Sequence, residues 1–123
     1  MKAIVIREPG GPEVLEMRDV PDVAPVRGEV RVRVRATAVN RADLLQRMGA
    51  YPAPPGSPKD IPGLEYSGEI DALGEGVTEF AVGDRVFGIA GGGAYAEKIV
   101  LPARTVARMP AALSFEEGAA VPE

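Results

Sequence analysis

The side chains that could do chemistry in this chain are carboxylates, amides and phenols, because the 123 residues include neither cysteine nor histidine. Without cysteine there is no thiol nucleophile, no disulfide and no thiolate metal site. Without histidine the usual zinc ligand, the usual general base and every Ser-His triad are absent. These absences exclude the enzyme classes that depend on thiol, imidazole or thiolate–metal chemistry.

Three residues with polar side chains, Asn40, Asp43 and Tyr51, lie within or beside one short predicted helix. Asn40 comes just before the helix, and its amide can both donate and accept hydrogen bonds. Asn40 also suits the N-cap of that helix, and the two roles are compatible. Asp43 could orient Asn40 or be a first-turn acid that the helix dipole favours. Tyr51 heads a proline-rich loop, where its phenol is either a hydrogen-bond donor or a structural residue.

Short strands separated by turns must position these residues. Residues 2–7 are apolar on both faces, which predicts a strand covered on both sides, and residues 14–20 suit a half-exposed partner strand. Residues 30–35 alternate Val and Arg, so the valines should face a core and the arginines solvent. The acidic net charge of −4 favours a solvated face over a nucleic-acid stripe. Further strands are predicted within residues 63–73, 85–89 and 94–101.

The remaining elements are a short helix and a stiff loop. Residues 42–48 predict a helix that ends at Gly49. Its apolar residues, expected on one side, are Leu44, Leu45 and Met48. Prolines crowd residues 51–62, and a long loop of this kind in a compact domain is more often functional than not. Many strands and little helix predict a closed or nearly closed β-barrel.

Length and composition predict a single globular domain with many turns. No apolar run approaches the roughly 20 residues that span a bilayer, and the N-terminus is not a secretory signal. The sequence pI of about 4.9 argues against a polyanion-binding protein. We therefore expect a cytoplasmic protein that binds neither nucleic acid nor membrane.

The C-terminal residues predict a helix that is soon broken. Ser114 to Glu117 has the S-x-x-E form of a capping box, so a helix should start at Ser114. Pro122 follows a few residues later, and the small apolar residues before it have nothing obvious to bury against. We therefore expect the chain to stop where a further domain should begin.

Four segments together resemble the N-terminal, GroES-like catalytic domain of medium-chain dehydrogenases/reductases, most of all the zinc-free NADPH:quinone oxidoreductase branch related to zeta-crystallin. The segments are 38–43 (AVNRAD), 61–68 (IPGLEYSG), 82–87 (VGDRVF) and 91–97 (GGGAYAE). The resemblance covers essentially the whole chain. It implies that residues 1–123 form a mainly β, partly closed GroES-like barrel with short helices. The Rossmann cofactor-binding domain of the family is expected to be missing from this chain.

The departures from the wider family bear on metal binding. Zinc-dependent relatives carry Cys where Asn40 stands, His where Leu64 stands, and a lobe with four cysteines that is absent here. Asn is a poor zinc ligand and Leu is none, so no catalytic metal is expected. Glu65 survives from the same motif, and its simplest role is to bind N–H groups of a turn. Residues 88–93 have glycines at the wrong offsets for a phosphate-binding loop.

The resemblance implies hydride transfer from NADPH to a quinone or related conjugated carbonyl, without zinc. It assigns catalytic roles to Tyr51 and Asn40, cofactor contacts to Asn40, Asp43 and Pro122, and the substrate pocket to Tyr51 and Leu64. The other two tyrosines, Tyr66 and Tyr95, are expected to be packing residues. The full-length form is expected to be a homodimer, and this piece alone to be inactive.

Two other functions stay open at this point. Enoyl-thioester and alkenal reductases share this half and differ mainly in their pocket loops. A standalone GroES-like binding or assembly module is a different class, and a co-chaperonin of that type needs a flexible loop with an apolar tripeptide. The loop of residues 51–62 is rich in proline and has Ile61 as its only aliphatic residue beyond alanine, so it does not favour that class.

Overall fold

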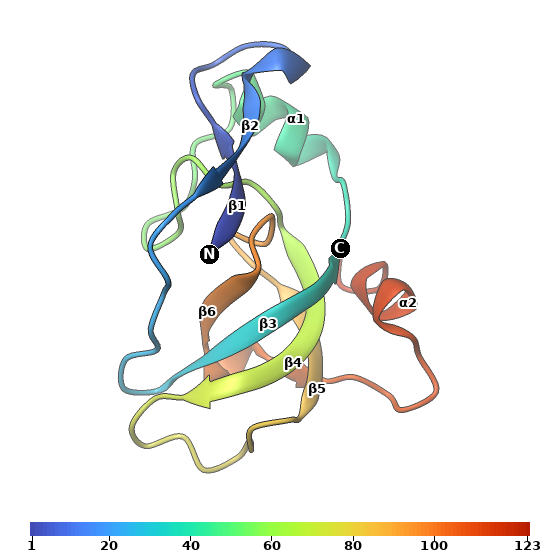
Figure 1. Cartoon of the computed structure of the whole chain (residues 1–123). Coiled ribbons are helices and arrows are strands. Elements are labelled where there is room, and N and C mark those ends of the chain that lie inside the picture. The colour runs from blue at the N-terminus through green and yellow to red at the C-terminus, as the bar shows by residue number, and fades with distance from the viewer.

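A computed structural model describes all 123 residues and consists of two antiparallel β-sheets with two short helices (Figure 1). One sheet has five strands in the order β6-β3-β4-β5-β7, and the other pairs β1 with β2. The strands and helices are β1 (Lys2–Ile6), β2 (Leu15–Asp19), β3 (Glu29–Thr37), α1 (Arg41–Arg47), β4 (Glu65–Leu73), β5 (Arg85–Ile89), β6 (Lys98–Pro102), β7 (Ala107–Arg108) and α2 (Phe115–Ala119). Neither helix is long and apolar enough to cross a membrane.

The five-stranded sheet curls into a barrel that stays open. Strand β3 pairs with β6 on one side and with the central strand β4 on the other, and two register shifts against β4 help to bend it. The edge strands β6 and β7 are joined by residues 103–106 alone, so the curled sheet brings its two edges together without pairing them. The prediction of a mainly β, partly closed barrel is confirmed, and full closure is not reached.

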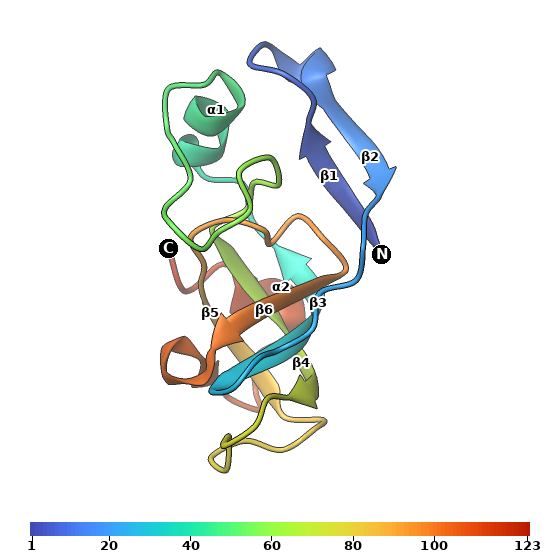
Figure 2. The ribbon, with the colours of Figure 1, turned by 90° about the vertical axis from the view of Figure 1, so that its left-hand side faces the viewer.

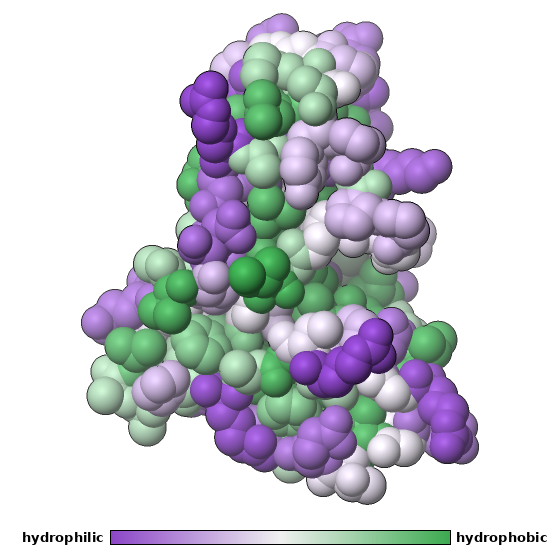
Figure 3. Space-filling model, turned by 180° about the vertical axis from the view of Figure 1, so that it is seen from behind, coloured by the Kyte–Doolittle hydropathy of each residue, from purple (hydrophilic) through white to green (hydrophobic).

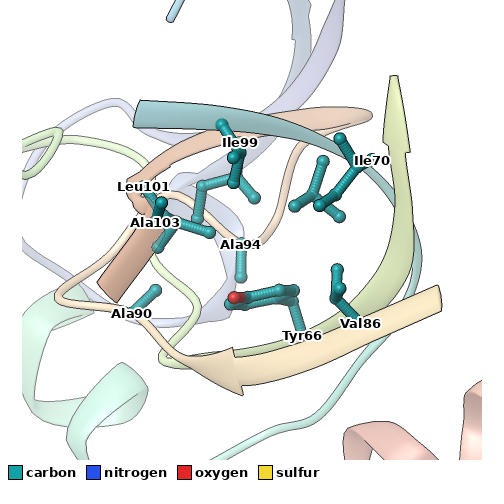
Figure 4. Close-up of a cluster of buried hydrophobic side chains, with 10 residues drawn as sticks. Tyr66, Ile70, Val86, Ala90, Ala94, Ile99, Leu101 and Ala103 are labelled. Carbon is teal, nitrogen blue, oxygen red and sulfur yellow. The ribbon is translucent and has the colours of Figure 1, made fainter. Parts of the chain in front are cut away.

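The apolar core fills the inside of this sheet (Figure 4). Val30 and Val32 of β3 are fully buried there, as their alternation with arginine predicted. The next two arginines of the strand are exposed, but Arg31 is half-buried and pairs with Asp71 through an Nε···Oδ1 contact of 2.7 Å. The cluster consists of Val30, Val32, Tyr66, Ile70, Val86, Ala90, Ala94, Ile99, Leu101 and Ala103.

The β1–β2 hairpin and α1 lie at one end of the molecule and the five-stranded sheet at the other (Figure 1 and Figure 2). The free edge of β1 is bonded to loops, since Ile4 N donates to Tyr95 O at 2.8 Å and Ile6 N to Asp60 O at 2.7 Å. The opposite faces of β1 are unequally covered, because Ala3 is buried whereas Ile4 is only half-buried. Seen from behind, polar and apolar side chains are interspersed over the surface (Figure 3).

Helix α2 packs on the outside of the sheet against β3, β4 and β5. Its capping box is formed as predicted, with Glu117 N donating to Ser114 Oγ at 3.1 Å and Ser114 N donating to Glu117 Oε1 at 3.2 Å. The expectation that the small apolar residues before Pro122 have nothing to bury against is wrong for Gly118 and Ala119, whereas Ala120 and Val121 are exposed. Ala119 is buried on the sheet, and Ser67 of β4 donates its hydroxyl hydrogen to the Phe115 carbonyl oxygen.

Candidate active site

Helix α1 buries polar side chains and exposes apolar ones. Asp43 and Gln46 are 5% and 6% exposed, whereas Leu44 and Met48 are 40% and 48% exposed. The predicted bounds of the helix are confirmed to within one residue, and two of its three predicted apolar residues, Leu44 and Met48, face solvent. The inner side of α1 meets backbone polar groups of the following loop, among them the Lys59 carbonyl oxygen, 3.4 Å from Gln46 Nε2. Buried groups of that kind require hydrogen-bonding partners.

Asp43 is the centre of one hydrogen-bonded cluster. Its Oδ2 accepts the backbone N–H of Asn40 at 2.9 Å and the hydroxyl of Tyr95 at 3.0 Å. Its Oδ1 accepts the backbone N–H of Gly63 at 3.0 Å. Three donors therefore surround a buried carboxylate, which is the condition for keeping such a group in the interior.

Glu65, at the start of β4, is the centre of a second cluster. The residue is 3% exposed, and its Oε1 accepts Asn40 Nδ2–H at 2.8 Å. Its Oε2 accepts the backbone N–H of Glu123 at 2.8 Å, and its own carbonyl oxygen accepts the Thr37 hydroxyl at 2.7 Å. Glu65 thus binds N–H groups, but they come from an asparagine side chain and from the C-terminal segment instead of from a turn.

Asn40 lies between the two carboxylates. It is the N-cap residue of α1 and has extended backbone angles, which confirms that part of the prediction. Its backbone N–H is bound by Asp43 and its side-chain amide by Glu65, so two separate restraints fix where the amide points. We call the group Asn40, Asp43, Gly63, Glu65 and Tyr95 the carboxylate junction. Asn40 itself is half-buried and stays accessible from solvent.

The other predicted site residues lie at varying places around the junction. Leu64 is next to Glu65 in sequence and is 6% exposed. Pro122 is half-buried and precedes Glu123, whose N–H is bound by Glu65. Tyr51 is 37% exposed and lines a separate hollow of about 470 Å³, which no other predicted site residue lines. The structure therefore brings Asn40, Asp43 and the Pro122 segment together and leaves Tyr51 outside this group.

The two remaining tyrosines differ from each other. Tyr66 is fully buried in the core, as predicted for a packing residue, and its hydroxyl has no hydrogen-bond partner. Tyr95 is half-buried, and its hydroxyl reaches Asp43, so its prediction as a mere packing residue missed a member of the junction. Burial raises the pKa of both phenols well above the usual range, and at Tyr95 the negative charge of Asp43 raises it further.

Comparison with known proteins identifies the family. Residues 26–111 match the alcohol dehydrogenase GroES-like domain. The chain belongs to this family, and its resemblance to the quinone oxidoreductases among the medium-chain dehydrogenases/reductases is confirmed.

Individual relatives agree with this assignment. The quinone oxidoreductase of Pseudomonas aeruginosa is 48% identical over 113 residues, which cover 91% of this chain and 34% of that protein. Among solved structures, human synaptic vesicle membrane protein VAT-1 homolog-like protein superposes with a TM-score of 0.91 at 37% identity, covering 99% of this chain and 39% of that one. Escherichia coli quinone oxidoreductase complexed with NADPH gives a TM-score of 0.88 at 34% identity, with 98% and 37% coverage. The chain spans about a third of the length of these relatives.

Proposed function

We propose that this chain is the substrate-binding half of an oxidoreductase that transfers hydride from NADPH to a quinone or related conjugated carbonyl without a catalytic metal. In this proposal residues 1–123 form one domain, and a cofactor-binding domain outside this chain holds most of the nucleotide. The full-length protein is proposed to be a homodimer. The observation that carries the proposal is Asn40, a half-buried residue held between two buried carboxylates in a domain similar to quinone oxidoreductases.

The junction suits a neutral polar ligand group better than a metal ion. Asp43 already accepts three hydrogen bonds and the Glu65 side chain two, so both carboxylates are balanced by N–H and O–H donors. A cation would have to displace these donors from buried positions, at a cost of about 1–3 kcal/mol for each group left unpaired. The Asn40 amide, in contrast, can bind a ribose hydroxyl or a carbonyl oxygen without displacing either carboxylate.

In the proposed reaction NADPH supplies the hydride when it is bound. The residues of this chain would orient the reactants and exclude water. Asn40 would bind the nicotinamide ribose or the substrate oxygen, and Asp43 and Pro122 would shape the cofactor side of the site. Tyr51 would donate a hydrogen bond to the quinone oxygen, where negative charge develops, and stack on the ring. Leu64 would form an apolar wall of the pocket at the position where zinc-dependent relatives carry a histidine ligand.

The first test compares substrate classes. The full-length protein that carries this chain is mixed with NADPH and either 1,4-naphthoquinone or crotonyl-CoA, and NADPH oxidation is followed by absorbance, with and without a metal chelator. We expect rapid oxidation with the quinone that the chelator does not change. Faster turnover of crotonyl-CoA than of the quinone would show that the protein is an enoyl-thioester reductase. No turnover of either substrate would overturn the proposal.

Two variants test the residues. Tyr51→Phe should lower kcat for the quinone, and Asn40→Ala should raise KM for NADPH, each by about threefold to tenfold, because each removes one hydrogen bond worth about 1 kcal/mol. Thr78→Ala, at an exposed position outside the junction, is the control. Unchanged kinetics in both variants would remove these site assignments.

A further inference from the structure

We propose that Tyr95 is a positioning residue of the carboxylate junction, whose hydroxyl acts through Asp43 to fix the direction in which Asn40 presents its amide. The kinetic part of this inference rests on the proposed function, but the geometric part does not.

Tyr95 and Asn40 meet at a single oxygen atom. Tyr95 Oη lies 3.0 Å from Asp43 Oδ2, and Asn40 N lies 2.9 Å from the same Oδ2. The Ala38 carbonyl oxygen, 3.3 Å from Tyr95 Oη, is the alternative acceptor for the phenol hydrogen. The position of Oδ2 thus decides where the Asn40 backbone is held, and the Tyr95 hydroxyl is one of the two donors that set this position.

The backbone of Tyr95 is anchored firmly enough for this role. Its N–H donates to Pro62 O at 3.0 Å, and its carbonyl oxygen accepts from Ile4 N at 2.8 Å, so strand β1 and the entry to β4 hold it from two sides. Gly63 allows the close approach. A Cβ there would lie 2.7 Å from Tyr95 Cδ1 and Tyr95 N, and the φ of +108° is one that a larger residue avoids. The Tyr95 phenol is therefore held in a fixed orientation toward Asp43.

Loss of the hydroxyl should affect Asn40 before it affects the fold. Without it, Asp43 keeps two donors, Asn40 N–H at Oδ2 and Gly63 N–H at Oδ1, and the carboxylate can tilt about its Cβ–Cγ bond. The bond from Asn40 Nδ2 to Glu65 would remain, so of the two restraints on Asn40 only the one through Asp43 would be loosened. The expected consequence is a wider range of amide directions and weaker binding of whatever Asn40 contacts.

The test is Tyr95→Phe, with Tyr66→Phe as the matched control that also removes a buried phenolic hydroxyl, but one without a partner. In the full-length protein, Tyr95→Phe should raise KM for NADPH about threefold to tenfold, the equivalent of one hydrogen bond, and leave kcat at saturating NADPH within about twofold. Tyr66→Phe should change neither constant. In the background of Asn40→Ala, Tyr95→Phe should have no further effect, since a positioning residue acts through the residue that it positions.

A second measurement keeps the inference testable if the proposed function fails. Backbone amide exchange and the side-chain amide resonances of Asn40 are recorded by NMR for this chain and both variants. We expect faster exchange at Asn40 and shifted Asn40 resonances in Tyr95→Phe alone. The inference would be overturned if the exchange rate and resonances of Asn40 in Tyr95→Phe matched those of the wild type. It would also be overturned if Tyr95→Phe weakened NADPH binding equally in the wild type and in Asn40→Ala.

Discussion

In the interior of the five-stranded sheet, contacting side chains come mostly from alternate positions of neighbouring strands. In the carboxylate junction they come from three separate segments of the chain. The sheet interior is held by apolar contacts that have no direction. The junction is held by hydrogen bonds in which each oxygen has particular donors. Asp43 and Glu65 are 5% and 3% exposed, within the range of the core residues, yet they are surrounded by N–H and O–H groups.

This difference separates stability from positioning. An apolar cluster loses stability roughly in proportion to the volume removed from it. In a buried carboxylate cluster, changing one donor or acceptor shifts the residues that are hydrogen-bonded to it, even if the side-chain volume is kept. The sheet should therefore respond to size and the junction to hydrogen-bonding capacity.

The largest expected effect is in the sheet. Ile70→Ala removes a side chain that is 1% exposed, and it should lower the free energy of unfolding by about 2–5 kcal/mol through lost burial and the remaining cavity. Urea unfolding of this chain measures it. Ile89→Ala, at a position that is 53% exposed, should change stability by less than about 0.5 kcal/mol. A similar loss in both variants would contradict the placement of the core.

An intermediate effect is expected in the junction. Glu65→Gln keeps the size of the side chain but places an NH2 group against one of two N–H donors, from Asn40 or from Glu123. We expect a loss of about 1–3 kcal/mol in the free energy of unfolding and shifted side-chain amide resonances of Asn40. Glu69→Gln on the same strand is the control, because Glu69 makes only a long surface contact of 3.5 Å to Arg35. Equal stability of the two variants would show that the Glu65 carboxylate is not needed.

The smallest effect at neutral pH belongs to Tyr66→Phe, because the removed hydroxyl has no partner, and stability should stay within about 0.5 kcal/mol. The effect grows in alkali. Burial raises the folded-state pKa of Tyr66 above that of the unfolded chain. The Tyr66 phenol leaves wild-type stability unchanged below pH about 10, where the phenol of the unfolded chain begins to ionise, and it lowers that stability as the pH rises toward the folded pKa. Urea unfolding across this range should show a shallower alkaline decline in Tyr66→Phe, and identical declines would contradict the burial.

The sequence predicts the sheet better than the junction, for a physical reason. The Val-Arg alternation of residues 30–35 is a local pattern, and it correctly predicts that Val30 and Val32 of β3 are buried. The capping box at Ser114 is local as well and is formed. The sequence does not reveal which face of α1 is buried, because the pattern of a seven-residue helix does not show that its inner side meets backbone polar groups such as Lys59 O and Gly63 N.

The junction was predicted only where its partners are close in sequence. Asp43 lies three residues after Asn40, and its orienting role could be anticipated from that spacing. Glu65 is 25 residues from Asn40, and Tyr95 is 52 residues from Asp43. No local signal links such distant polar residues, so these contacts become visible only in the folded chain.

The most direct test of the account is the equilibrium dissociation constant of NADPH for the full-length protein in four forms: wild type, Asn40→Ala, Glu65→Gln and Glu69→Gln. If the junction holds Asn40 for the nucleotide, the first two variants should bind NADPH about threefold to tenfold more weakly. Glu69→Gln should bind as the wild type does. Equal dissociation constants in all four forms would contradict the account.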